Sequence, residues 1–196
     1  MGGRARSGSL RPREIPEGRE ILNTLDPRSA LVLDTLELGR RAGAMLKQTF
    51  EAPAPEDLGN DVIGVPAGSA LELDLRLESV IEGVLATGLV EADVEGQCSR
   101  CLAPINYGLS VDFQELFEYP DEANSAEDDE VLRLDGDLLD LEPVVRDAVV
   151  LALPLAPLCS PDCLGLCVEC GADLNADPEH HHDNVDARWQ KMTQLL

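Results

Sequence analysis

Leu71-Glu-Leu-Asp-Leu-Arg-Leu-Glu78 is the most regular stretch of this sequence. A leucine alternates with a charged residue throughout, and this period of two places all four leucines on one side of a β-strand. A helix would scatter the same leucines around its circumference, although leucine and glutamate individually favour helix. The stretch therefore predicts a strand with one buried and one exposed face.

The same alternation recurs on the C-terminal side. It predicts strands over Leu89–Glu95 and Ile105–Phe117, and Val84–Thr87 is expected to continue the sheet after Gly83. A first strand is expected at Ala30–Leu38 and a short edge strand at Val131–Leu134, whereas Ala44–Phe50 is compatible with a short helix. These strands predict a mainly antiparallel sheet.

One helix is predicted from about Leu141 to Leu153. Asp140 is a suitable N-cap, and Pro154 is expected to stop the helix. Its apolar residues recur at helical spacing and form one face: Leu141, Val144, Val145, Ala148, Val149 and Ala152. A short C-terminal helix is expected around Asp186–Met192. The predicted fold class is α+β, with a mainly antiparallel sheet, a helix from the C-terminal half packed on it, and a Cys-rich, zinc-ribbon-like element.

Charge limits the classes of partner. The 196 residues hold 15 Lys and Arg against 38 Asp and Glu, a net charge of −23. Phosphate backbones and anionic lipids repel such a chain, which argues against a general nucleic-acid binder and a peripheral membrane protein. Residues 121–147 alone contain eleven acidic residues and two arginines, which favours a basic partner.

Composition divides the chain into three parts. Residues 1–28 form an Arg-rich arm, expected to be disordered or loosely docked, without the apolar segment of a signal peptide. Residues 29–157 are expected to form the α+β core. Residues 158–196 form a Cys/His-rich segment with the short helix, predicted to belong to the same domain. The expected location is cytoplasmic, where six cysteines indicate metal ligands or redox thiols rather than disulfides.

All six cysteines lie in two clusters. The first is Cys98-x2-Cys101, and the second is Cys159-x3-Cys163-x3-Cys167-x2-Cys170. Two C-x2-C pairs and two further cysteines indicate zinc, although unligated thiols are the alternative. A redox C-x2-C normally opens a helix, whereas a strand follows the first pair, so a zinc knuckle on a hairpin tip is favoured.

Two arrangements of ligands are open. The preferred one joins Cys98 and Cys101 to Cys159 and Cys163. A second site would then hold the other pair of cysteines together with two histidines: Cys167, Cys170, His180 and His182. The rival uses only the four cysteines of residues 159–170, and the histidines could simply belong to a polar loop. The expected cofactor is structural Zn²⁺, one or two ions.

Several stretches resemble the YceD family of large ribosomal RNA subunit accumulation proteins. They are the segments Glu95–Leu102, Asp140–Asp147, Leu158–Asn175 and Asp186–Trp189. The Arg-rich, Lys-poor composition is similar to that of an actinobacterial member. The resemblance implies a non-catalytic protein that supports accumulation or maturation of large-subunit rRNA, with no catalytic residues to carry over. The histidine triplet stands where many zinc-type members have Cys-x-Cys.

The expected function is therefore that of a ribosome-biogenesis factor, not an enzyme. Its expected partner is the large-subunit precursor or a basic ribosomal protein, with no membrane. Two alternatives remain open. One is a zinc module that binds RNA through Arg4 to Arg28 and Arg100, and the other is a thiol oxidoreductase that uses the C-x2-C pairs. A zinc hydrolase is disfavoured because ligands that are mostly cysteine are typical of closed sites.

Overall fold

The computed structural model describes residues 25–120 and 131–182. The arm up to residue 24, the acidic residues 121–130 and the expected C-terminal helix within 183–196 lie outside the described residues. No helix in the described part of the chain is long and apolar enough to span a membrane.

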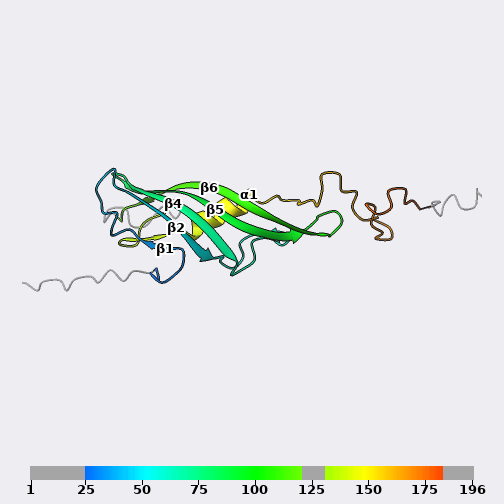
Figure 1. Cartoon of the computed structure of the whole chain (residues 1–196), viewed down its shortest axis with the longest axis horizontal. Helices are drawn as coiled ribbons and strands as arrows, with labels where there is room; N and C mark the ends of the chain where they lie inside the picture. The colour runs from blue at the N-terminus through cyan, green and yellow to red at the C-terminus, as the bar shows by residue number, and fades with distance from the viewer. Residues whose placement is uncertain (1–24, 121–130, 183–196) are drawn as a thin grey trace, which may run out of the picture.

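A twisted five-stranded antiparallel sheet forms most of the fold (Figure 1). Its strands are β2 (Met45–Pro53), β3 (Ile63–Gly64), β4 (Ala70–Ser79), β5 (Gly83–Gln97) and β6 (Pro104–Glu118). β2 pairs with β4, β4 with β5, and β5 with both β6 and β3. The expected antiparallel sheet is confirmed.

The alternating leucines occupy β4 as expected. Leu71, Leu73, Leu75 and Leu77 are at most 1% exposed, whereas the charged residues between them face outward. The two stretches expected around Gly88 form one continuous strand, β5. A Cβ atom at Gly88 would lie 2.5 Å from the Phe113 ring on β6, so glycine here makes room for the aromatic side chain of its cross-strand neighbour.

A second, two-stranded sheet leads into the helix. β1 (Val32–Asp34) pairs with β7 (Leu138–Asp140), and α1 (Glu142–Ala152) follows directly. The N-cap is Leu141 rather than the expected Asp140, which lies one residue earlier and accepts a hydrogen bond from the backbone N–H of Glu142 (3.0 Å).

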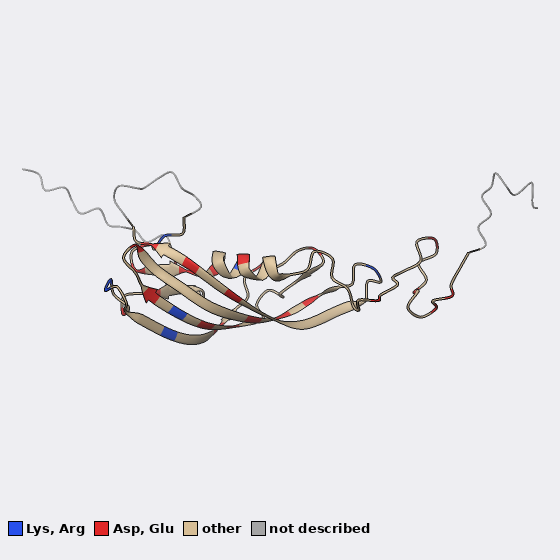
Figure 2. Cartoon of the chain, turned by 90° about the horizontal axis from the view of Figure 1, so that it is seen from above, with Lys and Arg blue, Asp and Glu red and all other residues tan. Residues whose placement is uncertain are grey.

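One face of the large sheet is covered by α1 and the adjoining loops (Figure 2). Three valines of the helix, Val144, Val145 and Val149, are buried in a single core with Leu77 and Phe117. Ala152, expected on the same face, is exposed because the helix ends there. The opposite face of the sheet carries the exposed side chains of β2, β4 and β5.

The short helix expected at Ala44–Phe50 is wrong, because these residues belong almost entirely to β2. Leu46, Gln48 and Phe50 point inward and alternate with exposed residues. A glutamine at an inward position hides this alternation in the sequence, and the segment is rich in helix formers. Pairing with β4 along nine residues overrides that local preference.

Two other expected strands are shorter or missing. The first covers only Val32–Asp34, because Asp34 Oδ1 accepts the N–H of Leu36 and Thr35 Oγ1 donates to the carbonyl of Asp137, which turns the chain. Val131–Leu134 forms no strand. It makes a single parallel bridge, between Arg133 and Glu118 at the end of β6.

Candidate metal centre

The turn between β5 and β6 presents the first cysteine pair. The N–H of Cys98 donates to the carbonyl of Ala103 (2.8 Å), and the N–H of Leu102 donates to the carbonyl of Cys98 (2.9 Å). Leu102 adopts a left-handed conformation with φ of 61°. This closed turn, the first knuckle (residues 98–103), carries Cys98 and Cys101 at the hairpin tip.

The second knuckle (residues 167–172) repeats the same hydrogen bonds. The N–H of Cys167 donates to the carbonyl of Ala172, and the N–H of Gly171 donates to the carbonyl of Cys167, both at 2.8 Å. Gly171 takes the left-handed position with φ of 74°. The two C-x2-C pairs therefore share one backbone geometry, although only the first is held between long strands.

The segment after α1 folds back against the hairpin tip. The N–H of Ser99 donates to the carbonyl of Pro157 (2.8 Å), and Arg100 Nη1 donates to the carbonyl of Cys163 (2.8 Å). Gly165 lies against Arg100, where a Cβ would come within 3.1 Å of the arginine carbonyl oxygen. These contacts bring Cys159 and Cys163 to the first knuckle.

The described residues contain two groups of potential metal ligands. In the first, the Cys98 and Cys163 sulfurs are 3.7 Å apart, and those of Cys101 and Cys159 are 3.5 Å apart. The ligand atoms within each group lie within 4.8 Å of one another. The first group is Cys98, Cys101, Cys159 and Cys163, and the second is Cys167, Cys170, His180 and His182.

The second group is more exposed and lies beyond the hairpin tip (Figure 1). Cys167 Sγ is 3.3 Å from His182 Nε2, and Cys170 Sγ is 3.2 Å from His180 Nε2. The two Nε2 atoms are 3.0 Å apart. All four side chains thus direct one donor atom each to a common point, and the remaining histidine, His181, instead places Nδ1 3.0 Å from the carbonyl of Glu179.

Both groups fit a tetrahedral zinc ion. With Zn–S bonds of about 2.3 Å, tetrahedral sulfurs lie about 3.8 Å apart, close to the separations in the first group. Four cysteines, or two cysteines and two histidines, are ligand sets of closed structural zinc sites. Each group could hold one metal ion, and an ion bound by all four ligands would have no tetrahedral position left for a reacting water.

Neighbouring polar groups support both sets of ligands. Asn175 Nδ2 lies 3.6 Å from the Cys163 sulfur, and the N–H of Arg100 lies 3.5 Å from the Cys98 sulfur. The histidines present their other ring nitrogens to carboxylates, His180 to Asp177 (3.9 Å) and His182 to Glu169 (3.7 Å). These carboxylates are near but beyond hydrogen-bond distance, and a shorter contact of this kind would orient each imidazole and fix the nitrogen that binds metal.

The thiols already differ in acidity without metal. Burial disfavours ionisation of Cys98, but the backbone N–H groups of Cys101, Cys159 and Arg100 outweigh it and lower the Cys98 pKa to about 6. The side chains of Cys101 and Cys163 raise the pKa of Cys159 to about 12. One sulfur of the group therefore ionises readily, whereas full deprotonation requires a cation among the four.

Sequence comparison places the chain in a family. Its residues 86–196 match the family model described as "Large ribosomal RNA subunit accumulation protein YceD". The matched region covers more than half of the chain and includes every candidate ligand. The chain belongs to the YceD family. The resemblance of the motifs is thereby confirmed, and no solved structure matches the chain.

Similar proteins occur in bacteria and a plant. A Mycobacterium tuberculosis protein is 45% identical over 86% of this chain and 82% of its own length. A Mycobacterium leprae protein is 39% identical over 86% of this chain and 78% of its own length. The maize "Large ribosomal RNA subunit accumulation protein YCED homolog 1, chloroplastic" is 27% identical over 52% of this chain and 41% of its own length.

The polar residues around the ligands are not evident from the sequence. Arg100, expected only as an RNA contact, instead joins the first knuckle to Cys163 through its guanidinium. No role was expected of Asn175, whose side-chain oxygen accepts the N–H of Leu164 (2.8 Å). An Asp-x-Asn turn closely following a C-x2-C-Gly knuckle was the available signal, because such residues commonly cap turns.

Proposed function

We propose that this YceD-family protein is a non-catalytic factor that supports the accumulation of large-subunit rRNA during ribosome biogenesis in the cytoplasm. It would act by binding a basic ribosomal protein or the large-subunit precursor, with zinc as a structural cofactor at one or both ligand groups. The family description names rRNA accumulation and no reaction, which supports a non-enzymatic role.

The observation that carries the proposal is a row of glutamates across the exposed sheet face. Glu51 on β2 pairs with Glu72 on β4, and Glu72 pairs with Glu91 on β5. Like charges directly opposite one another destabilise a sheet. The repulsion within this row lowers the stability of the sheet, and a partner with positive charge would relieve it on binding.

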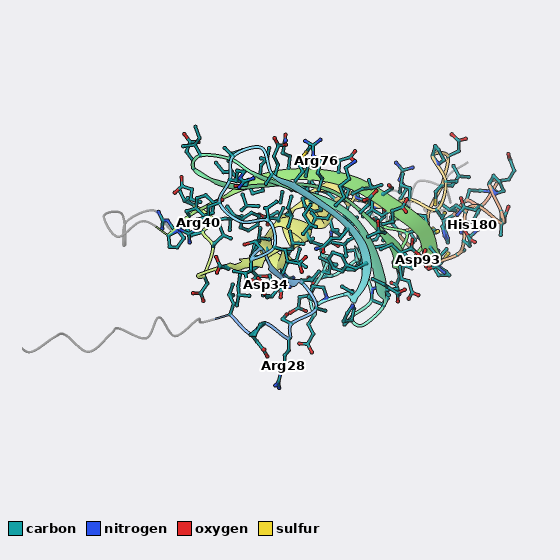
Figure 3. The ribbon with its side chains drawn as sticks, turned by 60° about the vertical axis from the view of Figure 1, so that its left-hand side comes forward. Arg28, Asp34, Arg40, Arg76, Asp93 and His180 are labelled. Carbon is teal, nitrogen blue, oxygen red and sulfur yellow. The ribbon has the colours of Figure 1, made fainter. Side chains whose placement is uncertain are left out.

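The two cations of this face lie toward one end of it, where Arg76 also pairs with Glu78 (3.4 Å). Lys47 and Arg76 lie opposite each other nearer the β4–β5 turn, whereas Asp93 and Glu95 follow the glutamates toward the hairpin tip. Figure 3 shows Arg76 and Asp93 well apart along the sheet, with Asp93 toward the end that carries His180. The acidic half of the face therefore offers an extended negative surface, the feature that recruits basic proteins.

The acidic residues 121–130 would add to this attraction, but they lie outside the described residues. Direct RNA binding has less support. The guanidinium of Arg100 is engaged with the Cys163 carbonyl, and Lys and Arg are few in the described chain (Figure 2). A thiol oxidoreductase is disfavoured because Cys98, the acidic thiol of the first pair, is fully buried.

Depletion of the protein in its own host tests the proposal. We expect mature large-subunit rRNA to fall relative to small-subunit rRNA, measured by hybridisation and by sedimentation of the subunits. Re-expression of the wild-type chain should restore the ratio. An unchanged ratio after complete depletion would contradict the proposed function.

Neutralising the glutamate row should have opposite effects on stability and binding. The triple variant Glu51→Gln, Glu72→Gln, Glu91→Gln removes two like-charge cross-strand pairs. We expect it to gain roughly 0.5–1 kcal/mol in unfolding free energy. Its affinity for RNA-free large-subunit proteins should fall at least tenfold in low salt, and its binding should become less salt-dependent.

A matched triple variant controls for net charge. Glu37→Gln, Glu56→Gln and Asp147→Asn remove the same three charges from exposed positions away from the row. Thermal melts and titrations at several salt concentrations should leave this control near wild type. Equal loss of binding in both triple variants would assign the attraction to overall charge rather than to the sheet face.

A further inference from the structure

Leu102 occupies a backbone conformation that suits glycine. Its φ is 61°, and Asp57 is the one other described non-glycine residue with positive φ. The corresponding residue of the second knuckle is Gly171, with φ of 74° and the same hydrogen bonds on either side. A leucine in the left-handed region is strained because its Cβ crowds the backbone.

Burial does not compensate for this strain. The Leu102 side chain is 61% exposed, so it contributes little to the core. Leu164, which directly follows Cys163 of the same ligand group, is 53% exposed. Most of the exposed large apolar side chains of the described chain lie on this hairpin, on the end of α1 or on the segment after it: Leu102, Tyr107, Leu151, Leu155, Leu164 and Val168.

The surroundings of these leucines are acidic. Between residues 155 and 182 there are five Asp or Glu and no Lys or Arg. Asp93 and Glu95 lie on the exposed side of β5 just before the first knuckle, and the one cation of that knuckle, Arg100, donates to the Cys163 carbonyl. Apolar side chains within a charged rim match the apolar centre and polar rim of protein interfaces.

We propose that the hairpin tip, which carries Leu102 and is joined through Arg100 to the segment that carries Leu164, is the docking surface for a basic protein, and that Leu102 inserts into an apolar pocket of that protein. This inference rests on the proposed function and adds the surface and the anchoring residue. A protein fits better than RNA because the acidic rim repels phosphate, and because the exposed leucines of this surface, Leu102 and Leu164, are aliphatic and give bases no ring to stack on.

One substitution is expected to remove the Leu102 side chain without disturbing the fold. Leu102→Gly reproduces the Gly171 geometry, so relief of strain offsets the greater freedom of the unfolded chain. We expect unchanged zinc content and a Tm shift below about 3 °C. Ile81→Gly is the matched control, since Ile81 is 89% exposed in the β4–β5 turn at the other end of the sheet.

The probe is the RNA-free mixture of basic proteins extracted from purified large ribosomal subunits. The full-length zinc-loaded chain is expected to bind it, Leu102→Gly to bind at least tenfold more weakly, and Ile81→Gly to bind as wild type. A photo-crosslinking residue at position 102, but not at position 81, should form a covalent adduct with a protein of the mixture. The crosslink keeps the test informative if Leu102→Gly folds poorly.

Wild-type affinity in Leu102→Gly, or no crosslink at position 102, would overturn the inference. So would a wild-type chain that binds none of the extracted proteins, or one that binds protein-free large-subunit rRNA through Leu102 instead. None of these results touches the rRNA ratio after depletion, so the proposed function is judged separately.

Discussion

Replacement of Cys98 by serine is expected to reduce the zinc content of the purified protein from two ions to one. Cys98 is fully buried, and its sulfur lies 3.7 Å from that of Cys163 in the first ligand group. A serine hydroxyl is a poor zinc ligand at neutral pH, and three thiols without the fourth leave an open site. The second group, with its own four ligands, should keep its ion.

The same substitution should loosen the segment after α1. Few large apolar residues between Cys159 and Val185 could hold this segment by packing alone, so metal binding would supply much of its folding free energy. We expect hydrogen exchange of residues 158–166 to increase by at least tenfold, while exchange in β4 and β5 stays slow. A chelator should produce the same pattern in the wild type.

Cys170→Ser is the matched control, because it removes a ligand of the second group only. It should also lose one ion, yet it should leave residues 158–166 protected through the first group. Elemental analysis with exchange mass spectrometry distinguishes the two variants. Unchanged zinc in Cys98→Ser would reject the site between hairpin and segment, and a metal-free wild type purified under reducing conditions would reject both sites.

Strands and helices whose apolar residues recur with the period of the buried face could be predicted from the sequence. Leu71 to Leu77 alternate strictly because one side of β4 faces the core and the other faces solvent. The helical spacing of Val145 and Val149 predicted α1 for the same reason. In both elements, the spacing of apolar residues in the sequence matches the spacing of buried side chains in the structure.

The predictions for β2 and for the length of β1 were wrong because hydrogen bonds to other backbone groups, rather than the hydrophobic pattern of each segment, determine its structure. β2 forms because β4 supplies a complete row of hydrogen-bonding partners, and an inward-facing Gln48 disguises its period. β1 ends at Asp34 because side chains there bond to nearby backbone groups, which no hydrophobic pattern reports. Tertiary context commonly overrides such weak local preferences.

For the candidate site, spacing indicated the ligand types but left the pairing open. C-x2-C fixes two neighbouring sulfurs, whereas the partner pair depends on how the chain returns after α1. That return is set by the hydrogen bonds of Ser99 and Arg100 to Pro157 and Cys163, which join residues more than fifty positions apart. The structure places the eight residues in the two groups of the preferred arrangement, and their occupation by zinc stays a prediction.

Substitution of Val149 by aspartate is expected to unfold the core that α1 forms with the large sheet. Val149 is fully buried on the face of α1 that packs against the sheet. An aspartate at this position either buries a negative charge or takes up a proton, and in both cases the apolar contacts of valine are lost. We expect either outcome to lower the free energy of unfolding by about 4 kcal/mol or more. That is a large part of the roughly 5–15 kcal/mol that stabilises a typical domain. Leu151→Asp, two residues along the helix but 85% exposed, should melt within a few degrees of the wild type. A Val149→Asp chain that stays soluble and unfolds cooperatively near the wild-type temperature would show that this face of α1 does not support the sheet.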